Sequence, residues 1–432
     1  MLVANPITYD GRVVRHAQTL AQAGHQVRVI GVLGPRDRED PLPVAADFQC
    51  ERIERRPRGV VATARWLHSA LRQRGAMWLW SRQPQWGLRS LDDAGLAALA
   101  VATSAPELAL WAILRGAQVI HANDLSTLPA AAWAARVLGC PYIYDAHELY
   151  IDEHPDLSDA ERRARARAEG HYIKHAAAVM TVNQLIADEL QQLYDVSAPV
   201  VVRNLPRWCA VPSPDSRPLP TPGRLRLLYH GAHIGLEQHG TDDILRALAR
   251  LRWVPGTVVS AAATAKAGPI PAIDATLTMR GGLTAEAERA LRARLSELGI
   301  ADFVTLCPPV PGAEALVQAA DADVGLAVHP PLCQSYRYTT SSKVYEYQAA
   351  GLAVCASDLV GNRLSVAADA GVFYPPSDDE QLAAVLRQLA LDPHRLRALQ
   401  QAAYAHAQAE LSWEHESERL LGIYRRLATT GA

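Results

Sequence analysis

The chain has 432 residues, of which 49% are hydrophobic and 20% are charged, and its formal net charge is −2. Because a single hydrophobic core rarely grows beyond about 250–300 residues, this length predicts two domains. The near-neutral charge excludes a globally basic protein, so no nucleic-acid partner is expected.

The cysteines and the first residues indicate a reducing compartment. The six cysteines are scattered and form no C-x-x-C pair, which favours reduced thiols over disulfides or a zinc site. The stretch MLVANPITYD lacks the basic and apolar regions of a signal peptide. We therefore expect a cytoplasmic protein.

Strands and helices alternate along the first half of the chain. Apolar runs predict strands at 1–6, 25–32, 117–124, 140–145, 177–183 and 199–204. Apolar residues spaced by three and four predict helices at 10–24, 126–139, about 157–176 and 184–194. Segment 94–114 is nearly long enough to span a bilayer, but Pro106 and Glu107 interrupt it, so a core helix or one lying on a membrane surface is favoured.

A proline-rich segment at 205–223 separates this half from a second alternating run and predicts a semi-rigid linker. The second run predicts strands at 225–231, 275–282, 302–309, 322–330 and 352–357. Its predicted helices lie at 240–251, 284–299, 312–320, 341–351 and after about 378. Such alternation is typical of parallel sheets with right-handed crossovers. The expected fold is two doubly wound, Rossmann-like α/β domains facing across a cleft, divided into 1–204, the linker 205–223, 224–405 and a C-terminal helix, 406–432, that packs back on the first domain.

The predicted helix SSKVYEYQAAG, at 341–351, carries the first candidate site. Ser341 or Ser342 can cap it, and the free N–H groups of its first turn suit a phosphate. Glu346 follows about one turn later, where its carboxylate can accept two hydrogen bonds from a ribose diol. The alternative is a surface ion pair between Lys343 and Glu346, three residues apart.

A second candidate site lies at 141–154, PYIYDAHELYIDEH, where a buried strand leads into Asp145, His147 and Glu148. Metal binding would need convergent ligands, but Asp145, His147 and His154 match no zinc pattern. We favour a cleft-facing His147 that hydrogen-bonds a sugar hydroxyl or a phosphate. The alternative is a histidine that caps the following helix.

Two further strand ends carry polar residues. His121, Asn123 and Asp124 follow the strand at 117–124, although Asp124 or Ser126 could simply cap the next helix. Gly11 and Arg12 stand at the tip of the loop that leads into the first helix. There is no G-x-G-x-x-G, so a dinucleotide fingerprint is lacking.

Residues 51–90 form a basic, aromatic stretch. Nine arginines, among them Arg55, Arg56 and Arg58, face only Glu51 and Glu54, with four tryptophans interleaved. Such a stretch could dock an anionic membrane surface or grip an anionic acceptor. The alternative is a solvated loop with a few buried tryptophans.

Taken together, these residues resemble the family 4 glycosyltransferases of the GT-B fold, over nearly the whole chain. The resemblance is carried by DGRVVRHAQTLAQAGHQVRV, by HANDLSTLPAAAWAARVLGCPYIYDAHELY, by SSKVYEYQAAGLAVCAS and by SWEHESERLLGIYRRL. It implies a nucleotide-sugar donor, expected to be a UDP-sugar, bound by the C-terminal domain, and a sugar, lipid-linked or other small acceptor bound by the N-terminal domain. It also implies retention of the anomeric configuration and no metal or other cofactor. The function expected is a role in cell-surface polysaccharide or glycolipid synthesis, and the stretch 51–90 would allow peripheral attachment at the inner membrane face. Alternatives are a nucleotide-sugar epimerase of the same fold or a non-catalytic nucleotide-sugar-binding partner.

The resemblance and the strand-end positions together assign the site residues. His147 and Asp145 are expected to be catalytic. The donor is assigned to Glu346, Lys343, Ser342, Ser341, Arg337, Tyr338, Gly231, His233 and Arg280. The acceptor is assigned to Arg12, Gly11, Asp124, Arg55 and Arg56.

Two positions depart from the family pattern. Tyr338 stands eight residues before Glu346, where the family often has a second glutamate near the donor sugar. The loop at 229–240, YHGAHIGLEQHG, offers His230, His233, His239 and Glu237 where the family usually brings an arginine and a Lys-Gly pair to the diphosphate. Arg337 and Lys343 are therefore expected to neutralise the diphosphate, together with helix N–H groups.

The 51–90 stretch should serve the acceptor or a membrane and not the donor. Replacing Arg55, Arg56 and Arg58 by glutamine should weaken binding to anionic liposomes or raise the acceptor KM, with donor affinity unchanged. Both effects should fade with salt, because the Debye length falls from about 10 Å at 0.1 M to about 3 Å at 1 M. Flotation at two salt concentrations and donor titrations measure this. A triple variant that floats normally, uses acceptor normally and loses donor binding would contradict it.

Overall fold

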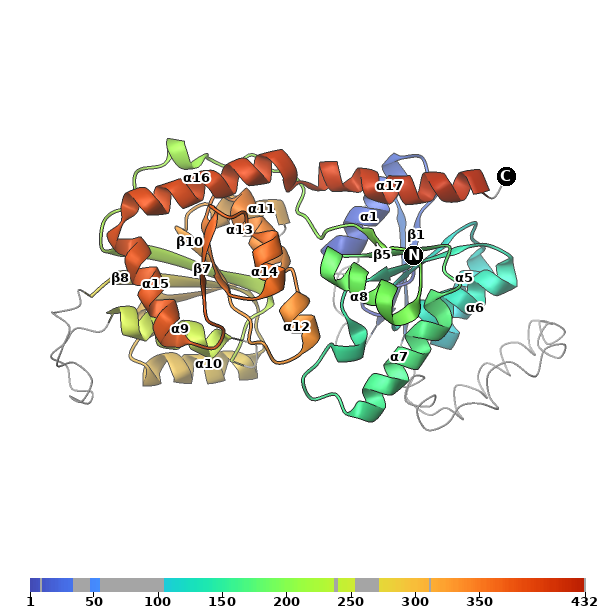
Figure 1. The fold of residues 1–432 in the computed structure, drawn as a ribbon, viewed down its shortest axis with the longest axis horizontal. Helices are drawn as coiled ribbons and strands as arrows, with labels where there is room; N and C mark the ends of the chain where they lie inside the picture. The colour runs from blue at the N-terminus through green and yellow to red at the C-terminus, as the bar shows by residue number, and fades with distance from the viewer. Residues whose placement is uncertain are drawn as a thin grey trace. The chain divides into compact units, whose positions relative to one another are not determined.

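The computed structural model describes residues 1–7, 10–33, 47–54, 105–236, 240–252, 272–310 and 312–430. The chain divides into two compact units, which Figure 1 colours along the sequence. Unit 1 comprises Met1–Arg203 with Ser417–Ala432, and unit 2 comprises Asn204–Glu416. Each unit is built on parallel strands with helices between them, which confirms the predicted fold class.

Unit 1 contains a four-stranded parallel sheet and a parallel strand pair. The sheet has the order β3 (Ile120–Asn123), β4 (Tyr142–Ala146), β5 (Ala178–Thr181), β6 (Val200–Val201), and the pair consists of β1 (Arg28–Leu33) and β2 (Gln49–Glu54). Leu2 connects the two by parallel bridges to Ile30 and Ala122. Of the strand predicted at 1–6, only this bridge forms. Strand β2, QCERIE, was not predicted, because its charged residues hide the apolar pattern of an edge strand.

Several helices of unit 1 begin or end at residues with clear capping chemistry. The helices of this unit are α1 (Gly11–Gln22), α5 (Ala105–Arg115), α6 (Leu128–Leu138), α7 (Asp159–Ile173), α8 (Gln184–Tyr194) and most of α17 (Trp413–Thr430), whose first four residues belong to unit 2. Ser158 and Glu161 form a reciprocal capping box at the start of α7. Gly139 ends α6 at φ 68°, a left-handed conformation that suits glycine. In α17, Arg419 donates to the carbonyl oxygen of Val201.

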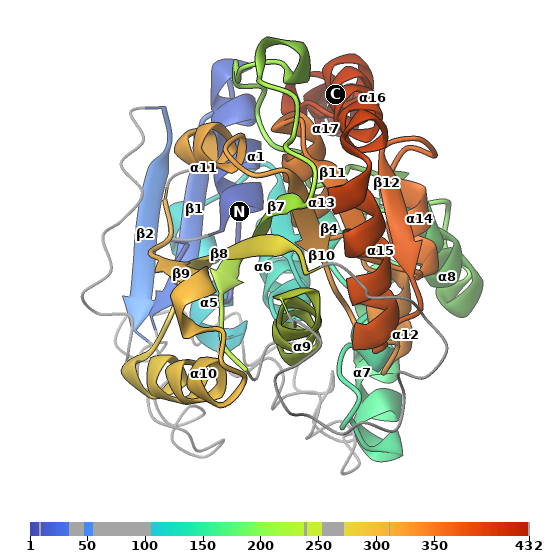
Figure 2. The ribbon, with the colours of Figure 1, turned by 90° about the vertical axis from the view of Figure 1, so that its left-hand side faces the viewer.

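Unit 2 contains a six-stranded parallel sheet (Figure 2). Its strand order is β12 (Gly371–Tyr374), β11 (Ala353–Ser357), β10 (Val324–Ala327), β7 (Arg224–His233), β8 (Asp274–Gly282), β9 (Val304–Cys307). The intervening helices are α9 (Thr241–Arg252), α10 (Ala285–Glu297), α11 (Gly312–Ala319), α12 (Gln334–Tyr338), α13 (Ser342–Ala349), α14 (Val360–Ser365), α15 (Asp379–Leu391) and α16 (Pro393–Glu410).

Both faces of the central strands of unit 2 are covered. Along β11, Ala353 and Cys355 join an apolar cluster with α9 and α15, while Val354 and Ala356 join another with α13 and α16. Alternate residues of a strand point to opposite faces, so these helix pairs lie on opposite sides of the sheet. This burial explains why the strand reads as an uninterrupted apolar run.

The proline-rich segment at 205–223 packs along unit 2. Leu205 and Val211 are buried in an apolar cluster with Tyr345 and Ala349 of α13. Arg217 donates to the carbonyl oxygen of Ala350 at 2.7 Å, just beyond the end of that helix. The segment therefore supports the back of α13.

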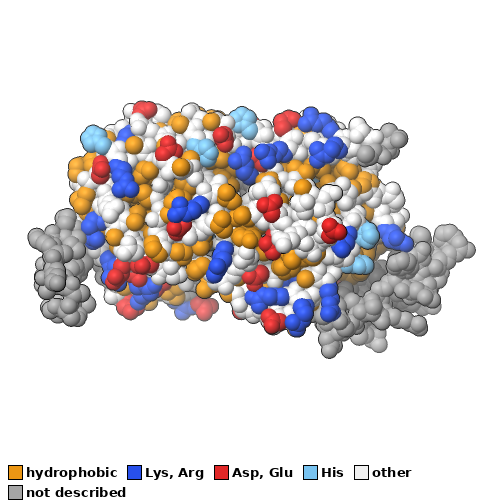
Figure 3. All heavy atoms as spheres, viewed as in Figure 1, with side chains coloured by type: hydrophobic (Ala, Val, Ile, Leu, Met, Phe, Trp, Pro, Cys, Tyr) orange, Lys and Arg blue, Asp and Glu red, His pale blue; other side chains and the backbone are white. Residues whose placement is uncertain are grey.

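No helix within the described ranges is long and apolar enough to cross a membrane. Of segment 94–114, residues 94–104 lie outside the described part, and the remainder belongs to α5, where Leu108, Ala109 and Ala112 are buried. On the face shown in Figure 3, basic and acidic side chains are interspersed over the described surface.

A buried carboxyl group in unit 1 should make the fold lose stability as pH rises from about 4.5 to about 7. Glu169 of α7 is fully buried and accepts hydrogen bonds from the hydroxyls of Tyr144 and Tyr194, at 2.5 and 2.8 Å. Burial outweighs these bonds and raises the pKa of Glu169 to about 7 from the ordinary 4.5. The folded state thus favours the protonated form. Its stabilisation is complete below about pH 4.5 and is lost as pH rises through about 7.

We predict that Glu169→Gln removes this loss. Above pH 8 the parent should lose roughly 3 kcal/mol of unfolding free energy, relative to its value at pH 5, that the variant retains. Denaturant titrations at several pH values measure the difference, with Asp188→Asn, an exposed change on α8, as the control. Equal pH dependence in the parent and Glu169→Gln would contradict the prediction.

Candidate active site

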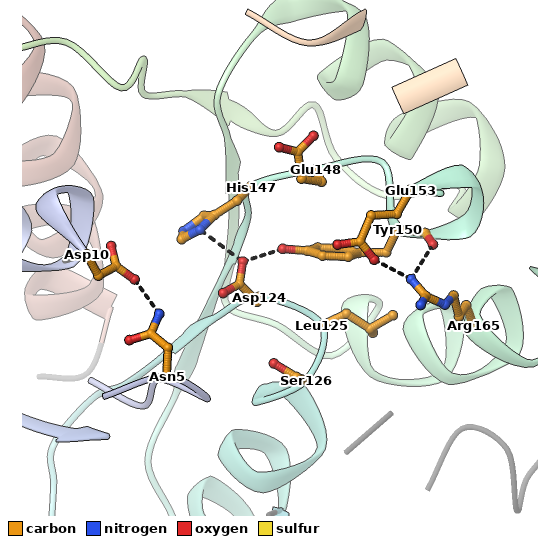
Figure 4. Close-up of a pocket in the computed structure, with 10 residues that line it drawn as sticks. All are labelled: Asn5, Asp10, Asp124, Leu125, Ser126, His147, Glu148, Tyr150, Glu153 and Arg165. Carbon is orange, nitrogen blue, oxygen red and sulfur yellow. Dashed lines mark hydrogen bonds and ion pairs between the residues drawn. The ribbon is translucent and has the colours of Figure 1, made fainter. Parts of the chain in front are cut away.

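A pocket of about 400 Å³ opens at the carboxyl ends of β3 and β4 in unit 1. Polar side chains dominate its lining, as Figure 4 shows. The lining residues are Asn5, Asp10, Asp124, Leu125, Ser126, His147, Glu148, Tyr150, Glu153 and Arg165. Ligands of doubly wound sheets bind at this edge, outside the carboxyl ends of the strands.

Asp145, the penultimate residue of β4, orders the floor of this region. Its carboxylate is fully buried and accepts two hydrogen bonds from Arg12, at 2.9 Å from Nε and 2.7 Å from Nη2. Arg12 Nη1 donates to the carbonyl oxygen of Val202 at 2.7 Å. Burial alone would raise the pKa of Asp145, but Arg12 and His147 hold it well below its usual range.

This geometry changes the roles expected for two residues. Arg12 is only 4% exposed, and its guanidinium is used by Asp145 and Val202. The expected contact of Arg12 with an acceptor does not fit this burial. Asp145 likewise lies beneath the pocket. Arg12 and Asp145 are therefore positioned to hold Val202 and His147 in place. Gly11, the first residue of α1, is exposed.

His147 lies between two carboxylates in the pocket wall. Its Nδ1 is 2.9 Å from Asp124 Oδ1 and its Nε2 is 3.1 Å from Asp145 Oδ2. Burial opposes the charged imidazole, yet the two carboxylates together raise the pKa of His147 well above 6.5. The two carboxylates therefore favour the imidazolium form of His147. The alternative role as a helix cap fails, because Leu149 occupies the N-cap of the next short helix.

Asp124 adopts a strained backbone at the end of β3. Its φ is 70°, in the left-handed region, where Asp is tolerated and where strain often marks functional sites. Its carboxylate accepts a hydrogen bond from Tyr150 and pairs with His147, as Figure 4 shows. The capping alternative for Asp124 or Ser126 is wrong, since Thr127 is the N-cap of α6.

Two buried histidines also lie close to the carboxylate of Asp145. His16 Nδ1 and His121 Nε2 lie 3.7 and 3.8 Å from Asp145 Oδ2, and His121 Nδ1 is 2.9 Å from the hydroxyl of Tyr424 in α17. Burial lowers the pKa of both histidines, which favours their neutral forms. This trio has the composition of a metal site. However, Arg12 already occupies both oxygens of Asp145, and its charge would repel a divalent cation.

Sequence reasoning missed several residues of this site. His16 lies one helical turn after Arg12, and that spacing could have indicated a shared face. Arg165, from the middle of α7, donates to the carbonyl oxygen of Tyr150 at 3.0 Å and to Glu153 at 2.5 Å. No local pattern distinguishes Arg165 from the other arginines of that helix.

A second polar group lies at the carboxyl end of the sheet in unit 2. Glu346 of α13 pairs with His230 of β7, with 2.8 Å between Oε2 and Nε2. The ring of His230 stacks on Tyr347 at 4.8 Å between centroids. The alternative interpretation expected an ion pair between Glu346 and Lys343. Instead Lys343 Nζ lies 5.7 Å from the centre of the Tyr229 ring, and burial lowers the pKa of Lys343, opposed by Glu346.

The remaining residues assigned to the donor occupy mixed environments. Ser341 is the N-cap residue of α13, but its side chain makes no capping hydrogen bond, which corrects the expected cap. Arg337 is exposed at the end of α12, and Tyr338, its neighbour, is partly buried. His233 is exposed at the end of β7.

Several predicted residues lie outside the described ranges. They are Arg55, Arg56, Arg58, the four tryptophans of 51–90, Glu237 and His239. Of that stretch, the described Glu51 pairs with Arg115 of α5 at 2.9 Å.

Comparison with known proteins places this geometry in a family. Residues 11–206 match the model of the glycosyl transferase 4-like domain, and residues 224–392 match that of glycosyl transferases group 1. The chain is 30% identical over 308 residues to D-inositol 3-phosphate glycosyltransferase of Saccharomonospora viridis, covering 68% of this chain and 66% of that protein. The corresponding protein of Stackebrandtia nassauensis is 29% identical, covering 71% and 67%.

Solved structures share the fold. Sucrose-phosphate synthase from Thermosynechococcus elongatus superposes with a TM-score of 0.69 at 16% identity, covering 99% of this chain and 98% of that one. Anabaena HepE in complex with UDP-glucose gives 0.63 at 13% identity, covering 98% of both chains.

Two parallel-sheet domains with polar strand ends, together with these matches, define a glycosyltransferase of the GT-B class. The chain belongs to the glycosyltransferases that combine a 4-like N-terminal domain with a group 1 C-terminal domain. It spans about two thirds of the length of the curated relatives it matches.

We predict that His147 keeps its proton at pH 7.5 and that Asp124→Asn lowers its pKa. The folded pKa lies above 6.5, so the ion pairs stabilise the fold fully below pH 6.5 and are lost as pH rises through the raised value. NMR titration of the His147 ring carbon proton measures this, with His147→Gln for assignment and Asp152→Asn as control. Titration of the parent at or below 6.5 would contradict the prediction.

Proposed function

We propose that the protein transfers a sugar from a nucleotide-sugar donor, bound on unit 2, to a hydroxyl of an acceptor bound in the pocket of unit 1. The observation that carries the proposal is the placement of Glu346. Its carboxylate is partly exposed at 31%, and His230 orients it at the strand edge. An oriented carboxylate can accept both hydrogen bonds of a ribose diol.

The donor is proposed to be a UDP-sugar. HepE, which shares the fold, is known in complexes with UDP and UDP-glucose. Positive charge for the diphosphate is available from Lys343, so the proposed reaction uses no metal. Retention of the anomeric configuration is part of the proposal and follows from the resemblance to family 4.

The acceptor is proposed to be polyhydroxylated. Carboxylates of Asp10, Asp124, Glu148 and Glu153 line the pocket and can accept hydrogen bonds from hydroxyls. The named relatives act on D-inositol 3-phosphate, which is also a polyol. A lipid-linked acceptor, held at an anionic membrane surface through 51–90, fits the proposed role in polysaccharide or glycolipid synthesis.

Incubation with UDP-, GDP- and ADP-sugars, with and without D-inositol 3-phosphate and simple polyols, tests the function. Acceptor-dependent release of nucleotide with formation of a glycoside supports it. Isomerised sugar without acceptor would identify an epimerase instead, and binding without turnover would identify a non-catalytic nucleotide-sugar-binding protein.

Glu346→Ala should weaken binding of the cognate nucleotide. Loss of charge-assisted hydrogen bonds to the ribose should reduce the binding free energy by roughly 1.5–3 kcal/mol. Calorimetry measures this, with Glu288→Ala, an exposed carboxylate of α10, as the matched control. Unchanged affinity in Glu346→Ala would remove the ribose role.

A further inference from the structure

One carboxylate oxygen in the floor of the unit 1 pocket is crowded by nitrogen atoms. Asp145 Oδ2 lies 2.9 Å from Arg12 Nε and 3.1 Å from His147 Nε2. His16 Nδ1 and His121 Nε2 follow at 3.7 and 3.8 Å. The single negative charge of this buried carboxylate is already shared by Arg12 and His147. A further cation at the same oxygen would repel both of them, so the arrangement depends on the neutral forms of His16 and His121.

The ionised carboxylate decides which ring nitrogen of His121 carries the hydrogen. A neutral imidazole has one N–H donor and one lone-pair acceptor. His121 of β3 is buried, and its Nε2 faces Asp145 Oδ2. A lone pair at Nε2 would be repelled by the negative charge, whereas an N–H group there is attracted to it. Nε2 therefore carries the hydrogen, and Nδ1 is left as an acceptor.

Tyr424 of α17 supplies the hydrogen bond that this acceptor requires. Its hydroxyl lies 2.9 Å from His121 Nδ1, although the two residues are 303 positions apart in the sequence. Burial and the charge of Asp145 raise the pKa of Tyr424, so the hydroxyl keeps its proton and donates it to Nδ1. A hydrogen bond to the neutral form of a group disfavours the charged form. Tyr424 therefore opposes the protonation of His121.

Other titratable or charged groups face this pair from the N-terminus, α1 and β4. They are the amino group of Met1, Arg12, His16 and Asp145 around His121, and His25 beside Tyr424. Burial lowers the pKa of His121 most strongly, Asp145 opposes that effect, and the charges of Met1 and Arg12 add to it. The neutral state of His121 is thus a balance between burial and the attraction of Asp145, and the hydrogen bond from Tyr424 stabilises the neutral ring.

We propose that Tyr424 is a positioning residue of the active site. Its hydroxyl keeps His121 neutral, so that the charge of Asp145 holds Arg12 and His147 alone. The inference rests on the proposed function, because an effect on sugar transfer requires that the acceptor binds in the pocket whose wall contains His147. A helix near the end of the chain thereby takes part in a site that is built by α1, β3 and β4.

NMR spectroscopy of isotope-labelled histidine rings in the ligand-free full chain tests this assignment, with His121→Gln to identify the signals. At about pH 7 the parent should show a neutral His121 ring with its hydrogen on Nε2. Tyr424→Phe should raise the pKa of His121 by about one pH unit, the effect expected for losing one hydrogen bond to the neutral ring. Tyr404→Phe removes a hydroxyl from α16 and is the matched control, with the titration of the parent expected. A hydrogen on Nδ1 in the parent, or identical titrations in the parent and Tyr424→Phe, would overturn the proposal.

The pH dependence of sugar transfer tests the role of Tyr424 in the pocket. Once His121 is protonated, its ring competes with His147 for Asp145. Tyr424→Phe should therefore move the acidic limb of kcat to higher pH by about one pH unit, with the donor KM unchanged. Combining Tyr424→Phe with His121→Gln should remove that displacement, because glutamine does not titrate. A loss of kcat that is equal at every pH and persists in the double variant would show a purely structural role and overturn the proposal.

The outcomes also separate this inference from the proposed function. If His121 responds to Tyr424→Phe as expected but the parent forms no glycoside, the assignment of Tyr424 stands and the proposed function fails. If the parent forms glycoside and Tyr424→Phe changes neither the titration of His121 nor the pH dependence of kcat, only this inference is wrong. A parent that forms no glycoside and carries the hydrogen of His121 on Nδ1 would overturn both.

Discussion

The buried carboxylate of Asp145 is the interaction on which the polar edge of unit 1 depends. It stands at the end of a strand in which all five residues are buried, so its charge must be compensated within the fold. Arg12 provides that compensation from α1, and the same guanidinium binds the carbonyl oxygen of Val202. One ion pair therefore ties the first helix, the fourth strand and the chain after β6 together around the pocket.

The charge of His147 follows from this arrangement. Arg12 neutralises Asp145 from one side, and His147 approaches its Oδ2 atom from the other, while Asp124 meets the second ring nitrogen. With both nitrogens facing carboxylates, the imidazolium is a donor on both sides and a fixed positive charge in the pocket wall. Such a group is suited to stabilising negative charge and orienting a substrate and is poorly suited to accepting a proton.

In unit 2, close packing of a helix against the sheet places the polar residues. A Cβ atom at Gly325 of β10 would lie 2.2 Å from the ring of Tyr347, so only glycine allows α13 to approach the sheet this closely. The hydroxyl of Tyr347 donates to the carbonyl oxygen of Leu326 and accepts from the backbone N–H of His230. This contact fixes α13 against β7 and β10, and Glu346 is placed as a result. In unit 1 the charges at the strand ends are already matched, whereas in unit 2 neither Arg280 nor Lys343 forms an ion pair with any of the described residues, although Glu346 acts on Lys343 electrostatically.

The sequence by itself determined the class of fold and the location of the polar strand ends. Long periodic helices such as α8 are predicted at their observed ends, 184–194, because apolar spacing and an Asn cap are local signals. The short elements β12, α12 and α14 were not predicted, since four to six residues hold too little periodicity. The DAHEL stretch was correctly located after a buried strand, but its partners lie far away in sequence, since Arg12 and Asp145 are 133 positions apart. The pairing of charged side chains depends on the register of the strands and on the packing of the helices. The distances between such side chains are set only by the tertiary structure.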